Sequence, residues 1–241
     1  LEGPIAANTN SLVCWGAVPA RHGMTMGEIA EWFRKTELKD SKLKLSVDLL
    51  DSWRPERLFN ECSLTWIPPS PNIPSPETAL LYTGTCLFEG TNVSEGRGTD
   101  TPFALIGAPW IDAVRVIAAI PVEASAGLRL GPATFTPRGI PGKAADPKFL
   151  NEECRGLDIA VIDARAARPF TLAVALLSAL RKIHGDRFAW EKSFDVLAGS
   201  ALLRERIDRG DDPMQIVRDN AASLAEFDAI RPKLYVEPSM A

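Results

Sequence analysis

The chain has 241 residues, of which 46% are hydrophobic and 24% are charged, and its formal net charge is −4. A chain of this length and composition can bury a substantial core, in one large domain or two smaller ones. The mildly acidic balance and the scattered Lys and Arg residues exclude the basic footprint of a nucleic-acid-binding protein. The longest apolar stretch, residues 172–180, is too short to cross a membrane.

The four cysteines are widely spaced and form no Cys-x-x-Cys pair. We therefore expect no metal site, and a chain of this size needs no disulfide framework. Buried free thiols are expected, with a single disulfide as the alternative. No cofactor is expected either.

The first predicted element is a helix that follows Thr25. In the stretch PARHGMTMGEIAEWF, Thr25 and Glu28 have the spacing of a capping box. Residues 43–50, LKLSVDLL, alternate apolar and polar residues at their start, which predicts a strand. Five prolines in residues 66–77 exclude a regular helix or a central strand and predict a stiff, ordered crossing.

A short helix is predicted next at residues 77–82, and a short buried strand at residues 84–88 that ends at Glu89. Before residue 101, helices and strands alternate as in a parallel α/β sheet. We therefore predict a domain boundary near residue 101.

Residues 102–241 are predicted to form a mixed α+β unit with a helical end. The strongest element is an amphipathic helix over 169–183, with Pro169 in its first turn and Gly185 just beyond its end. The remaining patterns predict strands over 128–135 and 157–162 and helices over 111–120, 199–209 and 213–230.

Polar side chains are concentrated on the glycine-rich stretch CLFEGTNVSEGRGT, residues 86–99. Its glycine spacing fits neither a P-loop nor a dinucleotide fingerprint. Ligands of parallel sheets bind beyond the carboxyl ends of strands, which is where Glu89 is predicted to lie. Asn92 and Ser94 suit sugar hydroxyls, and Arg97 carries a planar fork that suits a carboxylate. The alternative is a solvated turn whose glycines serve positive φ.

Several motifs together resemble one known family. They are RHGMTMGE (21–28), WIPPSPNIPSPETAL (66–80), GTCLFEGTNVSEGRGT (84–99), PFALIGAPWID (102–112), FTPRGIPGKAADPKFLNEECRG (135–156) and RPFTLAVALLSALRK (168–182). This pattern is similar to the NamZ-type exo-β-N-acetylmuramidases of bacterial cell-wall turnover, formerly the domain family DUF1343.

The resemblance implies a fold and a location. Residues 1–101 would be the C-terminal part of a Rossmann-like parallel-sheet catalytic domain, and residues 102–241 the α+β C-terminal domain. It implies that an N-terminal Rossmann-like half is missing from this chain. It also implies a secreted or periplasmic protein.

The implied activity is release of N-acetylmuramic acid from the non-reducing ends of peptidoglycan fragments, for cell-wall recycling. The alternative is a truncated relative that binds muropeptides without cleaving them. Glycosidic cleavage generally uses two carboxyl groups. Glu89 in FEGTN is the expected general acid/base. For its partner, Glu77 matches the family pattern better than Glu95, which is expected to support the site, although Glu77 could instead cap the helix that follows it. The partner could also be a non-carboxylate group, a neighbouring N-acetyl group or a residue on the missing half.

Other residues in the matched stretches are expected to contact the sugar. The lactyl carboxylate of muramic acid calls for a cation, for which Arg97, Arg21 and Arg138 are candidates. His22 precedes a predicted helix, where it could contact sugar or fix the turn by a hydrogen bond. The indole rings of Trp66 and Trp110 could stack on sugar rings or belong to the core.

Overall fold

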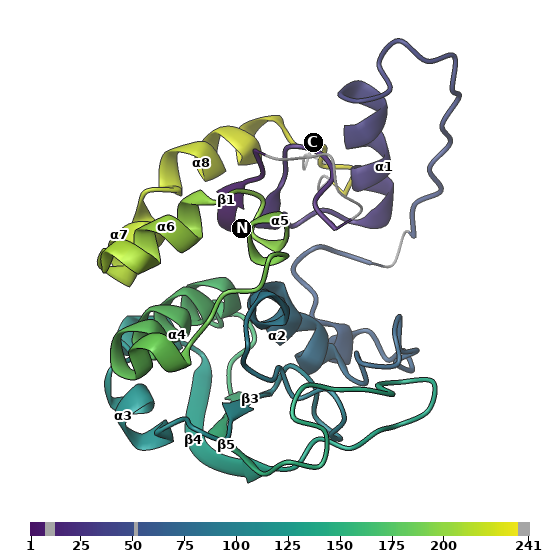
Figure 1. Ribbon diagram of the computed structural model, residues 1–241. Helices are drawn as coiled ribbons and strands as arrows, with labels where there is room; N and C mark the ends of the chain where they lie inside the picture. Colours follow the sequence, from purple (N-terminus) through teal and green to yellow (C-terminus); the bar gives the residue numbers. More distant parts are fainter. Residues whose placement is uncertain (8–12, 51–52, 236–241) are drawn as a thin grey trace.

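Two small antiparallel sheets and a set of helices form the protein (Figure 1). The computed structural model describes residues 1–7, 13–50 and 53–235. The first sheet pairs β1 (Glu2–Ile5) with β2 (Pro19–Arg21). The second has the order β3 (Leu105–Ala108), β5 (Cys154–Val161), β4 (Leu128–Phe135), with both pairings antiparallel. The fold is therefore a mixed α/β arrangement.

The predicted parallel, Rossmann-like sheet is not confirmed, because every strand pairing among the described residues is antiparallel. Residues 43–50 form no strand there, although their sequence alternates. Leu43 and Leu50 are each 56% exposed. A strand exists only where a neighbouring strand completes its hydrogen bonds, and no described strand lies beside this segment.

The strand predicted at residues 84–88 is also wrong. Helix α2 (Pro76–Thr85) continues directly into the 3₁₀ helix η2 (Cys86–Gly90). Ser75 caps α2 because its Oγ accepts a hydrogen bond from the Thr78 N–H at 3.2 Å. A short apolar run does not distinguish a buried strand from a buried helical turn, and here the helix continued through it.

The capping box at the first helix is confirmed. Helix α1 (Met26–Lys35) begins with Thr25 Oγ1 accepting from the Glu28 N–H, while Glu28 Oε2 accepts from the Thr25 N–H at 2.7 Å. Glu28 is buried, and its second oxygen accepts from the Leu234 N–H at 2.9 Å. The capping carboxylate therefore also joins the start of α1 to the C-terminal segment.

Helix α4 (Pro169–His184) lies at the centre of the core and packs against α2, β1 and several later helices (Figure 1). It confirms the predicted helix over 169–183, and strands β4 and β5 confirm the two predicted strands. The predicted helix over 213–230 is divided into two, α7 and α8. The remaining helices are η1 (Phe59–Glu61), α3 (Ala113–Ala118), η3 (Val122–Ser125), η4 (Gly185–Arg187), α5 (Phe194–Leu197), α6 (Leu202–Arg209), α7 (Pro213–Arg218) and α8 (Ala221–Ile230).

All four cysteines are free, as expected, but only Cys154 is buried; Cys14, Cys62 and Cys86 are partly exposed. Within the described residues, no helix has the length and apolar character needed to cross a membrane. The boundary near residue 101 stays a prediction.

Gly84 allows α2 and α4 to approach closely. A Cβ atom at this position would lie 2.1 Å from the Pro169 carbonyl oxygen and 2.6 Å from the Phe170 nitrogen. These are backbone atoms at the first turn of α4, so they cannot move aside as a side chain can. The contact between the two helices therefore requires glycine.

We expect Gly84→Ala to lower the free energy of unfolding by about 1–3 kcal/mol, because overpacking at the α2–α4 contact outweighs the better helix propensity of alanine. Gly131→Ala is the matched control, since a Cβ at Gly131 would meet nothing within 4 Å. Urea unfolding of both variants measures the difference. Equal stability of the two variants would contradict the packing argument.

Candidate active site

The glycine-rich loop is a packed part of the structure. Thr91, Val93 and Ser94 are buried, and Ser94 and Gly107 exchange two backbone hydrogen bonds of 2.8 and 3.0 Å. Gly96 and Gly98 have φ values of +78° and +81°, which L-residues rarely adopt. The expectation that the glycines serve positive φ is met, but the alternative of a solvated turn is wrong.

Arg97 bridges the two carboxylates of the loop. Its Nη2 lies 3.2 Å from Glu89 Oε1, and its Nε lies 3.2 Å from Glu95 Oε1. The guanidinium also lies over the ring of Phe103, with its Cζ atom 5.1 Å from the ring centroid. The planar fork of Arg97 is thus directed at two carboxylates of the protein itself.

Lys148 completes this cluster, and the sequence analysis did not single it out. Its Nζ donates to the carbonyl oxygens of Phe88, Glu89 and Val93, at 2.8, 3.2 and 3.1 Å. It also donates to Glu95 Oε2 at 3.1 Å. In the sequence, only its position in the matched stretch 135–156 indicates a role for Lys148. Its partners lie more than fifty residues earlier in the chain, so no local spacing connects them.

The two carboxylates of the loop have different environments. Glu95 is buried, and both of its oxygens are bound by cations. The Glu89 side chain is 28% exposed, and only its Oε1 has a partner in the described part of the chain. Glu95 is therefore a structural anchor, whereas Glu89 has one oxygen held by Arg97 and one oxygen without a partner among the described residues.

Tyr82 is a further polar group near Glu89. Burial raises the pKa of Tyr82, and the Cys86 thiol and the Glu89 carboxylate raise it further. Its ring packs edge-on against Phe103, with centroids 4.8 Å apart. Tyr82 therefore keeps its phenolic proton at neutral pH and can donate a hydrogen bond.

Glu77, Arg21 and Trp66 line a separate hollow of about 420 Å³. Glu77 Oε1 accepts from Asn60 Nδ2 at 3.1 Å, and Trp66 Nε1 donates to the Ile73 carbonyl at 3.1 Å. The backbone N–H of Glu77 donates to the Glu77 carboxylate and holds its pKa below the ordinary value, and the hydrogen bond from Asn60 lowers the pKa further. Glu89 does not line this hollow.

Helix α2 separates Glu77 from Glu89. Glu77 lies in the first turn of this ten-residue helix and Glu89 lies beyond its end. The helix is roughly 15 Å long at 1.5 Å per residue. The backbones of the two residues are thus about a helix length apart, whereas the paired carboxylates of glycosidases lie about 5–9.5 Å apart. Glu77 is therefore poorly placed to act on the same bond as Glu89.

Asn92 and Ser94 use their polar groups to hold the loop. Asn92 Nδ2 donates to the Arg187 carbonyl at 2.8 Å, and its Oδ1 accepts from the Ala189 N–H at 2.9 Å. Ser94 Oγ accepts from the Gly96 N–H at 3.2 Å. Both side chains thus have structural partners at the positions where sugar contacts were predicted.

The remaining predicted residues form no printed contact with Glu89 among the described residues. Arg21 donates to Glu2 Oε2 at 3.0 Å and to the Ala167 carbonyl at 2.9 Å. Arg138 is exposed, and its backbone N–H donates to the Gly98 carbonyl at 2.9 Å. His22 Nδ1 accepts a hydrogen bond from the Met24 N–H at 3.0 Å. Of the two alternatives for His22, this contact supports the hydrogen bond that fixes the turn.

We expect Lys148→Met to lower the free energy of unfolding by about 2–3 kcal/mol, because it removes one cation from buried Glu95 and the only described donor from the Glu89 and Val93 carbonyl oxygens. Lys192→Met is the control, since Lys192 is exposed and forms no bond in the described structure. Urea unfolding measures both. Loss of stability no larger than that of the control would show that Lys148 does not hold the loop.

We expect His22 to make stability fall as pH decreases. Burial lowers the pKa of His22 from 6.5, with a further contribution from the charge of Arg231. The unfolded chain therefore takes up the proton first, and the free energy of unfolding decreases below about pH 6.5. His22→Asn keeps an acceptor for the Met24 N–H but does not titrate. Its unfolding free energy should decrease less between about pH 8 and about pH 5.5; an unchanged decrease would contradict the assignment.

Two family models match this chain. The model for the C-terminal part of exo-β-N-acetylmuramidase NamZ matches residues 80–236, and the model for the N-terminal part matches residues 1–77. The prediction that a whole N-terminal half is missing is not supported, because the N-terminal model is represented. The chain spans about half the length of the curated relative it matches.

That relative is the peptidoglycan β-N-acetylmuramidase NamZ of Bacillus subtilis (strain 168). It is 31% identical over 239 residues, which make up 98% of this chain and 56% of that protein. Two solved structures of DUF1343 family proteins from Bacteroides fragilis NCTC 9343 are similar. One has a TM-score of 0.81 at 20% identity and covers 98% of this chain and 62% of its own. The other has a TM-score of 0.70 at 28% identity, and the match covers 96% of this chain and 60% of the solved chain. The chain belongs to the NamZ family of exo-β-N-acetylmuramidases.

Proposed function

We propose that this protein is a glycoside hydrolase that releases N-acetylmuramic acid from the non-reducing ends of peptidoglycan fragments. Its membership of the NamZ family supports the proposal, and so does the 31% identity to a peptidoglycan β-N-acetylmuramidase. The chemistry would serve cell-wall recycling.

The observation that carries the proposal is the arrangement of Glu89. One carboxylate oxygen is held by Arg97, and the other has no partner in the described part of the chain. A general acid or base needs a fixed orientation together with one oxygen that can reach the reacting group. The three carbonyl contacts of Lys148 fix the backbone from which Glu89 projects. We infer that Glu89 transfers the proton at the glycosidic oxygen.

Arg97 is inferred to position Glu89 and not to recognise substrate. Two of its three nitrogens are directed at Glu89 and Glu95, so its fork is occupied. A different cation must then recognise the lactyl carboxylate. Arg138 is the better candidate, because it is exposed and its backbone is hydrogen-bonded to the loop at Gly98.

The second catalytic group is not inferred to be Glu95. Moving Glu95 into contact with a substrate would break two ion pairs of a buried carboxylate, which is costly. A neighbouring N-acetyl group of the substrate could supply this role, as could a residue outside the cluster. We place the site where the two predicted domains meet, because Ser94 joins the loop to β3 across the predicted boundary.

Glu89→Gln should reduce turnover of a chromogenic N-acetylmuramic acid glycoside by at least about a hundredfold, because the amide cannot exchange the proton. Binding of a muramic-acid disaccharide, followed by calorimetry, should persist. Glu123→Gln is the control, since Glu123 is exposed and has no partner in the described structure.

Undiminished turnover in Glu89→Gln would refute the role of Glu89. If the unmodified protein binds the disaccharide but releases no product, the alternative of a non-catalytic muropeptide-binding relative replaces the proposal.

A further inference from the structure

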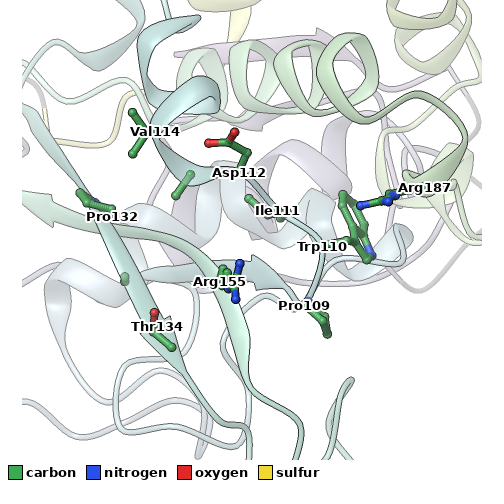
Figure 2. A pocket seen from close by; sticks show the side chains of 11 residues that line it. Pro109, Trp110, Ile111, Asp112, Val114, Pro132, Thr134, Arg155 and Arg187 are labelled. Carbon is green, nitrogen blue, oxygen red and sulfur yellow. The ribbon is translucent and has the colours of Figure 1, made fainter.

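A second hollow, of about 510 Å³, lies beside the three-stranded sheet (Figure 2). Strands β4 and β5 contribute Thr134 and Arg155, and the segment that leads into α3 contributes Trp110 and Asp112. Arg187, at the end of η4, lies beside Trp110 (Figure 2). The residues that line this hollow therefore come from four different elements.

Hydrogen-bond donors without partners are concentrated in this hollow. In the described structure, the guanidiniums of Arg155 and Arg187 form no ion pair, and the Trp110 indole N–H and the Thr134 hydroxyl form no hydrogen bond. The one carboxylate is that of Asp112, and its Oδ1 already accepts from the Arg115 N–H at 3.1 Å. The hollow thus offers several donors and an excess of positive charge, but few acceptors.

These donors project from paired strands and from segments held by side-chain contacts. Arg155 and Thr134 are directly paired residues of neighbouring antiparallel strands, so their side chains project from the same face. Asn92 binds the backbone of Arg187, and the Trp110 ring packs edge-on against His184 with centroids 5.2 Å apart. A ligand would therefore meet groups whose backbones do not need to rearrange.

Other arginines of the described structure also lack ion pairs, including Arg129 on β4, but Arg129 does not line this hollow. Two guanidiniums that line one hollow favour an oxyanion as ligand, because each presents a planar fork of N–H donors. The exposed apolar ring of Pro132 and the partly exposed Trp110 add a surface for a nonpolar part of the ligand.

We propose that this hollow is an oxyanion-binding site, which takes a ligand carrying a carboxylate or phosphate group next to a small apolar part. Arg155 and Arg187 bind the oxyanion, and Trp110 contacts the apolar part. The site is separate from Glu89, which does not line the hollow. The proposal is therefore independent of the proposed hydrolase activity.

The test follows the indole N–H signal of Trp110 by NMR, assigned with Trp110→Phe, during titration of the whole chain. Succinate and inorganic phosphate are the two oxyanion probes, and succinamide is the neutral analogue of succinate. Arg155→Gln and Arg187→Gln are the test variants. Arg129→Gln is the matched control, because it removes an unpaired arginine of the same sheet outside the hollow.

Saturable shifts with succinate or phosphate, and none with succinamide, are expected. The probe with the higher affinity identifies the ligand as a carboxylate or a phosphate. Each test variant should weaken binding about tenfold, the loss typical of a charged hydrogen bond, and Arg129→Gln should leave it unchanged. Equal shifts with succinamide, an equal loss in Arg129→Gln, or no saturable shift with either anion would overturn the proposal. Circular dichroism verifies that each variant is folded.

Discussion

The candidate site depends on the ion pair between the ammonium group of Lys148 and the buried carboxylate of Glu95. A buried carboxylate such as Glu95 is costly unless cations and hydrogen bonds replace its water. Lys148 and Arg97 supply those cations, so two carboxylates and two cations balance within one cluster. The three carbonyl contacts of Lys148 then close the backbone turn that carries Glu89. The conformation of Glu89 is thus a consequence of how Glu95 is neutralised.

The glycine-rich loop connects this cluster to the rest of the molecule in two directions. Ser94 pairs with Gly107 and so aligns the loop with β3. Asn92 binds the backbone of the segment that carries Arg187, beside the hollow of unpaired donors. The side chains that would suit sugar hydroxyls therefore serve to place two charged regions relative to each other. This explains why a loop rich in small polar residues is nevertheless largely buried.

Elements governed by local interactions were predictable. The capping box of α1 needs only residues three apart, and α4 follows from its own apolar face and its Pro and Gly ends. The predictions that were wrong concern segments whose secondary structure depends on a neighbouring element. Residues 43–50 have a strand-like alternation but no adjacent described strand, and residues 84–88 continue a helix because α2 precedes them. An apolar pattern in the sequence indicates that a segment is buried. Burial alone does not specify whether its backbone hydrogen bonds are those of a helix or of a strand.

By itself the sequence determined the family, through motifs spread along the chain, and it identified Glu89, Glu95 and Arg97 as a group on one loop. Only the tertiary structure decided what each group does. It brought Lys148 to Glu95 across fifty-three residues, directed Arg97 at the protein's own carboxylates and separated Glu77 from Glu89 by the length of a helix. The physical reason is that the charge state and orientation of a polar side chain are set by partners brought near by packing. Those partners have no fixed spacing in the sequence.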